Sequence, residues 1–600
     1  MAWYDEAIFY HIYPLGLMGC PHENSYDKPV SRLKEIKPWI DHIKETGFNA
    51  IYIGPLFESV GHGYETTDYM KLDSRLGTNE DLKEFMSTCH EKGIKVILDG
   101  VFNHTGRDFF AFKDIREKRE NSKYLGWYSG VNLGGNNSFN DGFSYDNWGG
   151  YDLLVRLNQK NPEVQGYIAD VIRYWVKEFD IDGLRLDAAD VLDFEFMQML
   201  RRVADEVKPD FYLMGEVIHG EYIRWERDAR IHAVTNYHLH KALYSGHNEH
   251  NYFEIAHTVK RLYDMGGCNP LGLRLYNFAD NHDVERIYSR LNNKQHFMPL
   301  HILMYTLPGI PSVYYGSEFA IEGKKGGWDD WAIRPALDLK VCSEDEQRRP
   351  YYELIKALCH IRQALPVLSY GVYEQLLLTN RQYVFARKDG DDIAIAAVNN
   401  DENPAWIDVN VPAGVYKGML SGKEADASNG MLHVELKASN GDIFVKTNDN
   451  NKNIKIETGL QSGIEAGVQS EIEPVVLTEI KDKEETETDH KKQDYVNNIA
   501  EVPESNDHAA KILETSVGSV AVIRESTKEE NVVMSTQDGV KKDPSVTVCN
   551  KPYEEMTVEE LQAAIIQKMS KNGPVTDDMR RSVNDNVWHD SLVNWVKSFR

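Results

Sequence analysis

Eight short apolar runs alternate with amphipathic helical patterns over roughly the first 360 positions of the chain, whose full length is 600 residues. Strands that are separated by helices run parallel, and eight such units predict a (β/α)8 TIM barrel, a fold of the α/β class. Two helical patterns cover residues 79–92 and 161–179, and the second begins with a capping asparagine before a proline. The predicted strands are residues 8–13, 50–54, 95–101, 183–187, 212–216, 233–237, 273–278 and 310–315.

Two segments depart from this rhythm. Residues 105–157 are rich in Gly, Asn, Asp, Tyr and Trp and are too long for a plain loop, so we expect an inserted subdomain after the third strand. The barrel would then consist of residues 1–104 and 158–363. Short alternating strands within residues 364–448 predict a C-terminal antiparallel β-sandwich. These strands are residues 383–386, 393–398, 406–411, 431–436 and 442–446.

The end of the chain has a different composition. Residues 451–550 contain 20 Asp or Glu, 11 Lys or Arg and a single aromatic, Tyr495. Such a segment can bury little apolar surface, so residues 449–550 are predicted to be a disordered acidic linker. A capping box at residues 557–560 precedes renewed apolar periodicity, which predicts a small helical module at residues 551–600. This module is either a docking site for an unknown protein partner or a plain helical hairpin.

Charge and composition narrow the class of ligand. The formal net charge of −27 argues against nucleic acid and anionic membranes, which attract basic surfaces. No stretch reaches the roughly 18 consecutive apolar residues of a membrane span, and the N-terminus has no secretory pattern. Six cysteines without CxxC spacing predict neither a zinc site nor a disulfide framework. We therefore expect a cytoplasmic protein with a neutral substrate and leave its oligomeric state open.

Acidic residues stand at the far ends of three apolar runs. They are Asp187 after Ile181-Asp-Gly-Leu-Arg-Leu, Glu216 after Phe211-Tyr-Leu-Met-Gly, and Asp283 after Leu275-Tyr-Asn-Phe-Ala-Asp-Asn-His. A carboxylate at a buried strand end contributes poorly to a core, but barrel enzymes build their active sites from the carboxyl ends of several strands. The three together predict an enzyme.

The sequence around these acids resembles glycoside hydrolase family 13, the α-amylase family. Four segments match its signature regions in order: Asp99-Gly-Val-Phe-Asn-His104, Gly183-Leu-Arg-Leu-Asp187, Gly215-Glu-Val217 and Phe278-Ala-Asp-Asn-His-Asp283. The resemblance spans roughly residues 1–448 and implies the same architecture of barrel, insertion and sandwich that the pattern predicts.

The resemblance implies a retaining glycoside hydrolase. Such enzymes need an ionised carboxylate as nucleophile and a protonated carboxyl as acid/base, about 5–5.5 Å apart. Arg185, two residues before Asp187 on the same strand face, would keep that carboxylate ionised, which suits the nucleophile. The apolar setting of Glu216 favours protonation and suits the acid/base, and the resemblance makes Asp283 the transition-state stabiliser. The alternative for Arg185 and Asp187 is a structural ion pair.

The resemblance also implies residues that bind the substrate. His104 and His282 match histidines that hydrogen-bond the sugar at the cleavage site, although a histidine can also be an ordinary core residue. Tyr64 matches the tyrosine that stacks on that sugar, with loop packing as the alternative. Asp99 and Arg185 are expected to orient the site.

The resemblance does not favour a metal cofactor. Asn103 matches a calcium ligand of many α-amylases, but the Lys-His pair that usually follows the second signature is replaced here by Ala188-Ala-Asp190. We therefore expect a structural role for Asn103 and no required cofactor.

Several segments resemble the cyclomaltodextrinase and neopullulanase branch, among them Leu154-Val-Arg-Leu-Asn158, Glu216-Val-Ile-His219 and Val234-Thr-Asn-Tyr237. Ile218 departs from a tryptophan of that branch, and the N-terminal β-domain that the branch commonly carries is missing from this sequence. The expected substrates are α-1,4-linked maltooligosaccharides, maltodextrins or cyclodextrins. A transglycosylase with the same residues is one alternative, and a non-catalytic glycan-binding or assembly protein is another.

Overall fold

The computed structural model describes residues 2–264, 274–326, 330–447, 561–562 and 564–566. The predicted acidic linker, residues 449–550, lies outside the described residues. So does the predicted helical module, residues 551–600, except for residues 561–562 and 564–566, which are helical, with Leu561 and Ile565 buried. No helix in the described part of the chain is both long and apolar enough to span a membrane.

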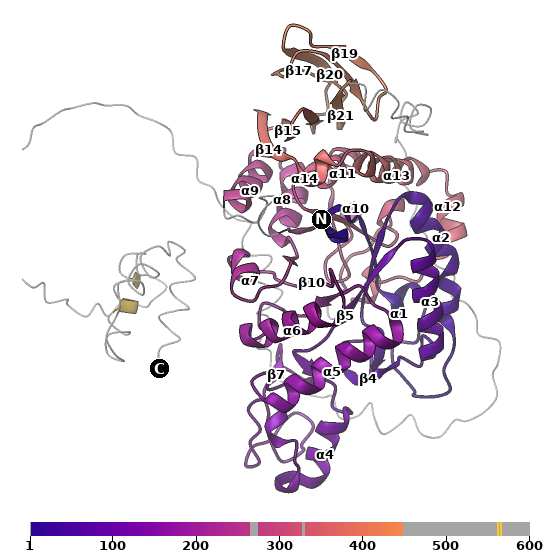
Figure 1. The fold of residues 1–600 in the computed structure, drawn as a ribbon, viewed down its shortest axis with the longest axis vertical. Coiled ribbons are helices and arrows are strands. Elements are labelled where there is room, and N and C mark those ends of the chain that lie inside the picture. The colour runs from indigo at the N-terminus through magenta and orange to yellow at the C-terminus, as the bar shows by residue number, and fades with distance from the viewer. Residues whose placement is uncertain (1, 265–273, 327–329, 448–560, 563, 567–600) are drawn as a thin grey trace, which may run out of the picture. The chain divides into compact units, whose positions relative to one another are not determined.

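Eight parallel strands form the central sheet, in the order β11-β10-β9-β5-β2-β1-β13-β12. A parallel bridge between Thr235 and Tyr276 joins the two ends of this order, and the Asn236 N–H donates to the Tyr276 carbonyl at 2.9 Å. The sheet therefore closes into the predicted (β/α)8 barrel (Figure 1). Its strands are β1 (Phe9–Ile12), β2 (Ala50–Ile53), β5 (Lys95–Gly100), β9 (Gly183–Leu186), β10 (Tyr212–Gly215), β11 (Ala233–Val234), β12 (Tyr276–Phe278) and β13 (Ile310–Tyr314).

The third and sixth β/α units follow the expected pattern, with one correction. The strand predicted at residues 233–237 is cut to β11 because the Asn236 side chain accepts the Leu239 N–H and so starts helix α8 at Tyr237. Helix α5 begins at Pro162, directly after the capping Asn161, as predicted. The long helices are α2 (Lys37–Thr46), α3 (Asn79–Glu91), α5 (Pro162–Phe179), α6 (Phe194–Val207), α8 (Tyr237–Asn248), α9 (Tyr252–Asp264), α11 (Phe297–Thr306) and α13 (Arg349–Ala364).

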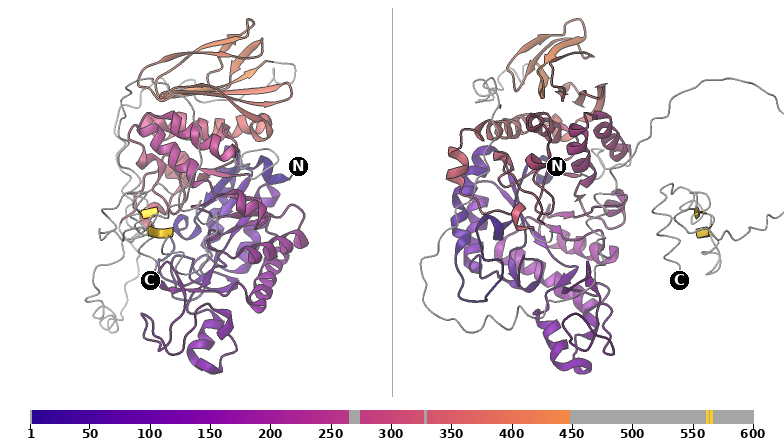
Figure 2. Two further views of the ribbon diagram at one scale, coloured as in Figure 1. Left: turned by 90° about the vertical axis from the view of Figure 1, so that its left-hand side faces the viewer. Right: turned by 180° about the vertical axis from the view of Figure 1, so that it is seen from behind.

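Shorter helices complete the connections around the barrel (Figure 2). They are α1 (Pro14–Leu17), α4 (Phe110–Lys118), α7 (Ile223–Arg227), α10 (Ile287–Arg290), α12 (Leu339–Glu344) and α14 (Val367–Tyr370). A hairpin of β3 (Phe57–Ser59) and β4 (Thr66–Leu72), which the sequence pattern did not predict, comes after β2. Its connecting turn contains Tyr64.

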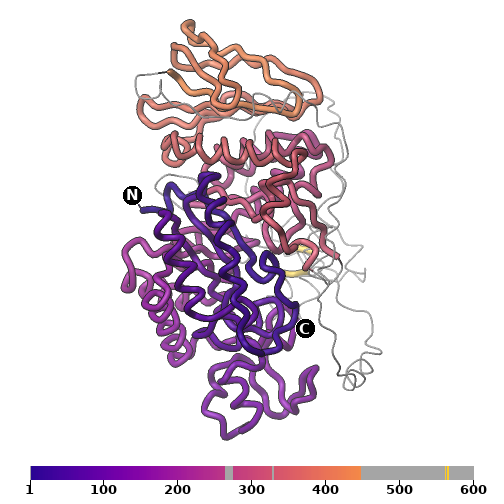
Figure 3. Tube along the Cα trace, turned by 90° about the vertical axis from the view of Figure 1, so that its right-hand side faces the viewer, coloured from indigo at the N-terminus to yellow at the C-terminus, as the bar shows by residue number. Residues whose placement is uncertain are grey.

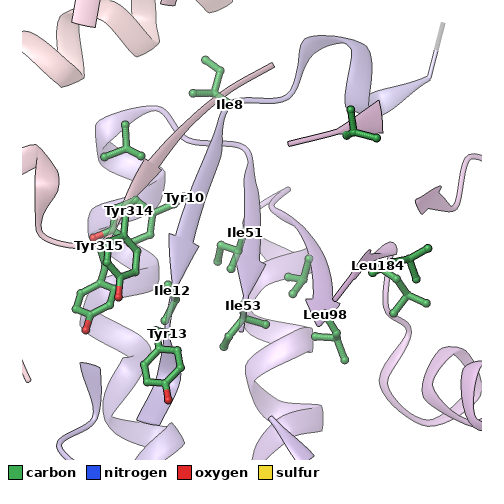
Figure 4. Packing of buried hydrophobic residues seen from close by; sticks show 14 of the residues in the cluster. Ile8, Tyr10, Ile12, Tyr13, Ile51, Ile53, Leu98, Leu184, Tyr314 and Tyr315 are labelled. Carbon is green, nitrogen blue, oxygen red and sulfur yellow. The ribbon is translucent and has the colours of Figure 1, made fainter. Parts of the chain in front are cut away.

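The barrel strands are buried on both faces. One face packs against the surrounding helices through residues such as Ile8, Tyr10, Ile51 and Leu98 (Figure 4). The opposite face forms a separate apolar cluster inside the barrel, which includes Phe9, Tyr52, Ile97, Tyr212, Met214, Tyr276 and Phe278. Side chains alternate across a strand, so the polar residues that follow the interior side chains at each strand end also face the inside of the barrel.

The segment at residues 105–157 carries a small sheet in the order β6-β8-β7, with β6 (His104–Thr105), β7 (Asn147–Trp148) and β8 (Tyr151–Arg156). Phe112, Tyr128, Phe143 and Tyr145 pack together beside it. Helix α4 and strand β7 lie at one end of the chain trace and the C-terminal strands at the other (Figures 1 and 3).

A β domain comes after the barrel. Six strands pair antiparallel in the order β14-β15-β16-β21-β18-β19, and β17 pairs with β20 in a second sheet. Three of these strands, β14, β18 and β19, were not predicted from the sequence. The bounds are β14 (Val372–Leu378), β15 (Gln382–Asp389), β16 (Asp392–Asn399), β17 (Ala405–Asn410), β18 (Val415–Gly418), β19 (Glu424–Asp426), β20 (Met431–Leu436) and β21 (Asn440–Lys446).

Each face of the larger C-terminal sheet has its own partner. One face packs against β17 and β20 through residues that include Ile395, Ile407 and Leu432. The other face, with Phe385 and Ile443, belongs to the same apolar cluster as the barrel helices. Arg387, which is buried, donates to the Thr306 carbonyl at the end of α11, 2.9 Å away.

Candidate active site

Strand register brings four polar side chains together inside the barrel. Asp99 on β5 lies opposite Arg185 on β9, and Arg185 lies opposite Met214 on β10. Asp187 and Glu216 come two positions after Arg185 and Met214, so both continue the interior face beyond the strand ends. The carboxyl ends of three neighbouring strands therefore supply the floor of one site.

Arg185 contacts all three of these carboxylates. Its Nη1 lies 2.8 Å from Asp99 Oδ1 and 2.8 Å from Asp187 Oδ1, and its Nη2 lies 2.8 Å from Glu216 Oε2. The Arg185 side chain is only 3% exposed, so water does little to screen these contacts. The two carboxylates predicted to perform the chemistry are thus held on one guanidinium.

One cation cannot neutralise three buried carboxylates, and the pKa values reflect this. Burial raises the pKa of Glu216 to about 7, against the opposing effect of Arg185 and with a further raising effect from Asp283. Burial also raises the pKa of Asp187 well above its ordinary range, with Arg185 opposing it and Glu216 adding to it. A proton on Glu216 removes one negative charge from beside Asp187 and thereby favours the ionised form of Asp187.

Asp283 is held by a second arginine. Arg334 Nη2 lies 3.0 Å from Asp283 Oδ1, and Arg334 Nε donates to the His282 carbonyl at 2.9 Å. His282 Nε2 lies 3.0 Å from Asp283 Oδ2. The Asn281 side chain accepts the Asp283 N–H at 2.8 Å and donates to the Tyr237 hydroxyl at 3.1 Å. These contacts fix the turn after β12 that carries Asp283.

Aromatic rings line one side of this floor. Tyr64 and Tyr13 both stack on His282, with ring centroids 5.8 Å apart in each case. Trp331 meets Tyr13 edge to face at 6.1 Å, and His22 lies parallel to Trp331 at 3.9 Å. The rings form a continuous wall that leads outward from the floor.

Asp99 is hydrogen-bonded to one of these aromatic residues, Tyr64. Its Oδ2 accepts hydrogen bonds from the Tyr52 hydroxyl at 2.9 Å and the Tyr64 hydroxyl at 3.2 Å. The Tyr64 hydroxyl also bonds to His282 Nε2. Asp99 therefore links Arg185 to the stacked rings.

His104 lies at the start of the inserted segment, on β6, and is 1% exposed. Burial lowers the pKa of His104 to about 4, so the imidazole is neutral near pH 7. Its backbone pairs with Arg156 on β8, which connects the inserted segment to the end of β5.

Asn103, the candidate calcium ligand, is hydrogen-bonded to a neighbouring side chain. Asn103 Oδ1 accepts an amide N–H from Gln159 at 3.3 Å, and Gln159 Oε1 accepts the Asp193 N–H at 2.6 Å. The side-chain oxygen that would bind the cation is thus engaged by a donor. Among residues 2–264, 274–326 and 330–447, no three His, Cys, Asp or Glu side chains are grouped to hold a metal.

Sequence reasoning missed several residues of this site. Arg334 and Trp331 come after the last barrel strand in a loop without periodicity, so no pattern marked them. Tyr13 could have been found, because it stands at the carboxyl end of the first predicted strand, as Asp187 and Glu216 do at theirs.

Family models match most of the described chain. A model described as "Alpha amylase, catalytic domain" matches residues 22–357, and one described as "Alpha amylase, C-terminal all-beta domain" matches residues 378–461.

Individual proteins show the same similarity. A cyclomaltodextrinase from a Bacillus species is 30% identical over 447 residues, which cover 70% of this chain and 77% of that protein. An intracellular maltogenic amylase from Bacillus subtilis is 30% identical over 354 residues, 58% of each protein. The crystal structure of a Nostoc punctiforme debranching enzyme superposes with a TM-score of 0.61 at 26% identity and covers 74% of this chain and 99% of that one.

Because the Asn103 oxygen is already engaged by Gln159, we expect chelators to have little effect. Dialysis against EDTA should leave the melting temperature within about 2 °C of its original value, since no metal-binding free energy is lost. Differential scanning fluorimetry with and without added calcium measures this. A large decrease that calcium reverses would contradict it.

Proposed function

Because this chain belongs to the α-amylase family of glycoside hydrolases, we propose that it hydrolyses α-1,4-linked maltooligosaccharides, maltodextrins or cyclodextrins with retention of configuration. The observation that carries the proposal is the shared guanidinium of Arg185, which holds Asp187 and Glu216 side by side at the carboxyl ends of β9 and β10. A retaining mechanism requires two carboxyl groups that are close together but differ in protonation.

Asp187 is the proposed nucleophile. Arg185 contacts its Oδ1, which leaves Oδ2 to attack the anomeric carbon and form a glycosyl-enzyme ester while the glycosidic C–O bond breaks. Water then attacks the same carbon, and the ester bond to Asp187 breaks. Two inversions give a product with the starting α-configuration.

Glu216 is the proposed acid/base. Its Oε2 faces Arg185 and accepts the Ala188 N–H at 2.9 Å, so its proton resides on Oε1, near the Tyr237 hydroxyl. With a pKa of about 7 it is about half protonated in neutral solution and largely protonated in mildly acidic solution, and its acid form can give a proton to the departing sugar oxygen. The resulting carboxylate then takes a proton from the attacking water.

The remaining residues are proposed to hold the reacting sugar. Asp283, held by Arg334 and His282, faces the site as the third carboxylate and would stabilise the positive charge that develops on the ring. Tyr64 would stack on the apolar face of that sugar, and the neutral His104 and His282 would hydrogen-bond its hydroxyls.

The substrate class and location have separate support. The relatives are named for cyclomaltodextrins and for maltose production, and those names describe hydrolysis rather than transfer. We also propose a cytoplasmic location, supported by the buried free thiols of Cys20, Cys89, Cys342 and Cys359 and by the intracellular relative.

The reaction can be followed directly by proton NMR on maltotriose. We expect α-anomers as the first products, before mutarotation, and no oligosaccharide longer than the substrate. A β-anomer formed first would exclude the proposed double displacement. Products longer than maltotriose would instead identify a transglycosylase with the same residues.

Asp187→Asn removes the proposed nucleophile and keeps its size. We expect kcat to fall by at least about a thousandfold, because the amide cannot form the ester, with the melting temperature changed little. Asp180→Asn, at the exposed C-cap of α5 before the same strand, is the matched control and should keep full activity. Comparable activity in both variants would mean that the nucleophile lies elsewhere.

The pKa of Glu216 sets the pH dependence on the alkaline side. The acid form is needed, so kcat/KM should be highest below pH 7 and decrease about tenfold per pH unit well above it. With an activated substrate such as an aryl maltoside, the alkaline decrease in kcat/KM should be much smaller. The aryl leaving group needs little protonation when the glycosidic bond breaks. An alkaline limb that stays unchanged with such a substrate would argue against Glu216 as the acid.

A further inference from the structure

The outer face of the β17–β20 sheet carries an exposed tryptophan. Trp406 is 60% exposed, more than any other large hydrophobic side chain in the described parts of the chain. Its neighbours on β17, Ile407 and Val409, point inward and are buried in the core of the β domain. The strand alternation therefore fixes Trp406 on the outer face of this two-stranded sheet. Figure 1 shows β17 and β20 on the side of the β domain away from the barrel helices.

The indole is held in place by a neighbouring side chain. His433 on β20 stacks on it with ring centroids 4.5 Å apart and an interplanar angle of 13°. The His433 imidazole is in turn held by Asp408, with Nδ1 2.7 Å from Oδ1, and these two residues face each other directly across the strand pair. With one indole face against His433, the exposed surface of Trp406 is its opposite face and edge.

Hydrogen-bonding groups surround this open ring. Glu435 faces Trp406 across the strands, and Asp408 and His433 form the next pair along the same face. Burial alternates along both strands, so these side chains are exposed beside the indole. A flat ring flanked by carboxylate oxygens offers apolar stacking together with acceptors for hydroxyl groups.

An exposed indole beside carboxylates is suited to one class of ligand. The carboxylates, on a chain of net charge −27, disfavour nucleic acid and anionic lipid. The polar neighbours leave no continuous apolar area of the kind that forms the centre of a protein interface. A neutral sugar chain, which has an apolar ring face and hydroxyls at its edges, matches both the indole and its surroundings.

We propose that Trp406, His433, Asp408 and Glu435 form a second, non-catalytic binding site for α-glucan chains on the C-terminal β domain. The choice of α-glucan rests on the proposed function. The site lies on a different domain from Asp187 and Glu216, so it would retain long chains without contributing to cleavage of short ones. Two sites on one chain raise the local concentration of a long substrate, which neither site would do alone.

The test uses affinity electrophoresis of the full chain in gels with and without amylopectin, in an Asp187→Asn background that prevents digestion. Trp406→Ala should weaken retardation by at least about fivefold in apparent Kd, because the stacking surface is lost. Trp406→Tyr should restore most of it. The matched control is Val415→Ala, an exposed position on β18 of the same domain, which should behave as the parent.

Kinetics on the otherwise wild-type chain complete the test. Trp406→Ala should leave kcat/KM on maltotriose within about twofold and increase KM on amylopectin. Equal retardation of the parent and of Trp406→Ala overturns the proposal. So does a parent chain that sediments as a dimer when Trp406→Ala sediments as a monomer, because this face would then be an interface between two copies. Retardation is a binding measurement, so it is informative even if maltotriose is not cleaved, which would contradict only the proposed function.

Discussion

The candidate active site depends on one buried cation, the Arg185 guanidinium. Arg185 lies among Asp99, Asp187 and Glu216 on three neighbouring strands, and each carboxylate is 2.8 Å from one of its terminal nitrogens. A buried charge without its partner typically costs about 3–5 kcal/mol, so the three strands are tied to a common register at their polar ends. The same arrangement leaves more negative charge than positive, which is why a proton is retained there near neutral pH. The strand register and the proton proposed for the acid/base thus both depend on the charges around Arg185.

Another buried arginine, Arg75, holds two loops beside the candidate active site in place. Arg75 is buried, paired with Asp73, and donates from Nη1 to the carbonyls of His22 at 3.0 Å and Gly61. The His22 carbonyl belongs to the loop that carries the His22 ring, and the Gly61 carbonyl belongs to the turn that leads to Tyr64. The aromatic wall is therefore positioned through backbone contacts that do not themselves reach the floor of the site, in the way that supporting groups orient reactive ones.

Strand periodicity made part of the site predictable from the sequence. Asp187 and Glu216 could be placed because side chains alternate along a strand, which fixes the face of the sheet on which an acid at the strand end lies. The same alternation places Asp99 on β5. Asp283 was placed by the same pattern, at the end of the run that starts at Leu275, and only its role came from motif resemblance. Arg334 and Trp331 were not predictable, since their loop meets the site only after the barrel closes. Strands β18 and β19 were missed because each is only three or four residues long.

The packing of the C-terminal β domain has a consequence for how the molecule loses its structure. Phe385 and Ile443 on its larger sheet share one continuous core with α11, and Arg387 donates to the end of that helix. Separation of the β domain from the barrel would expose this apolar surface to water. It would also leave the buried Arg387 guanidinium without the Thr306 carbonyl as an acceptor. We therefore expect the barrel and the β domain to unfold together, so that a destabilising change in either domain also disrupts the candidate active site.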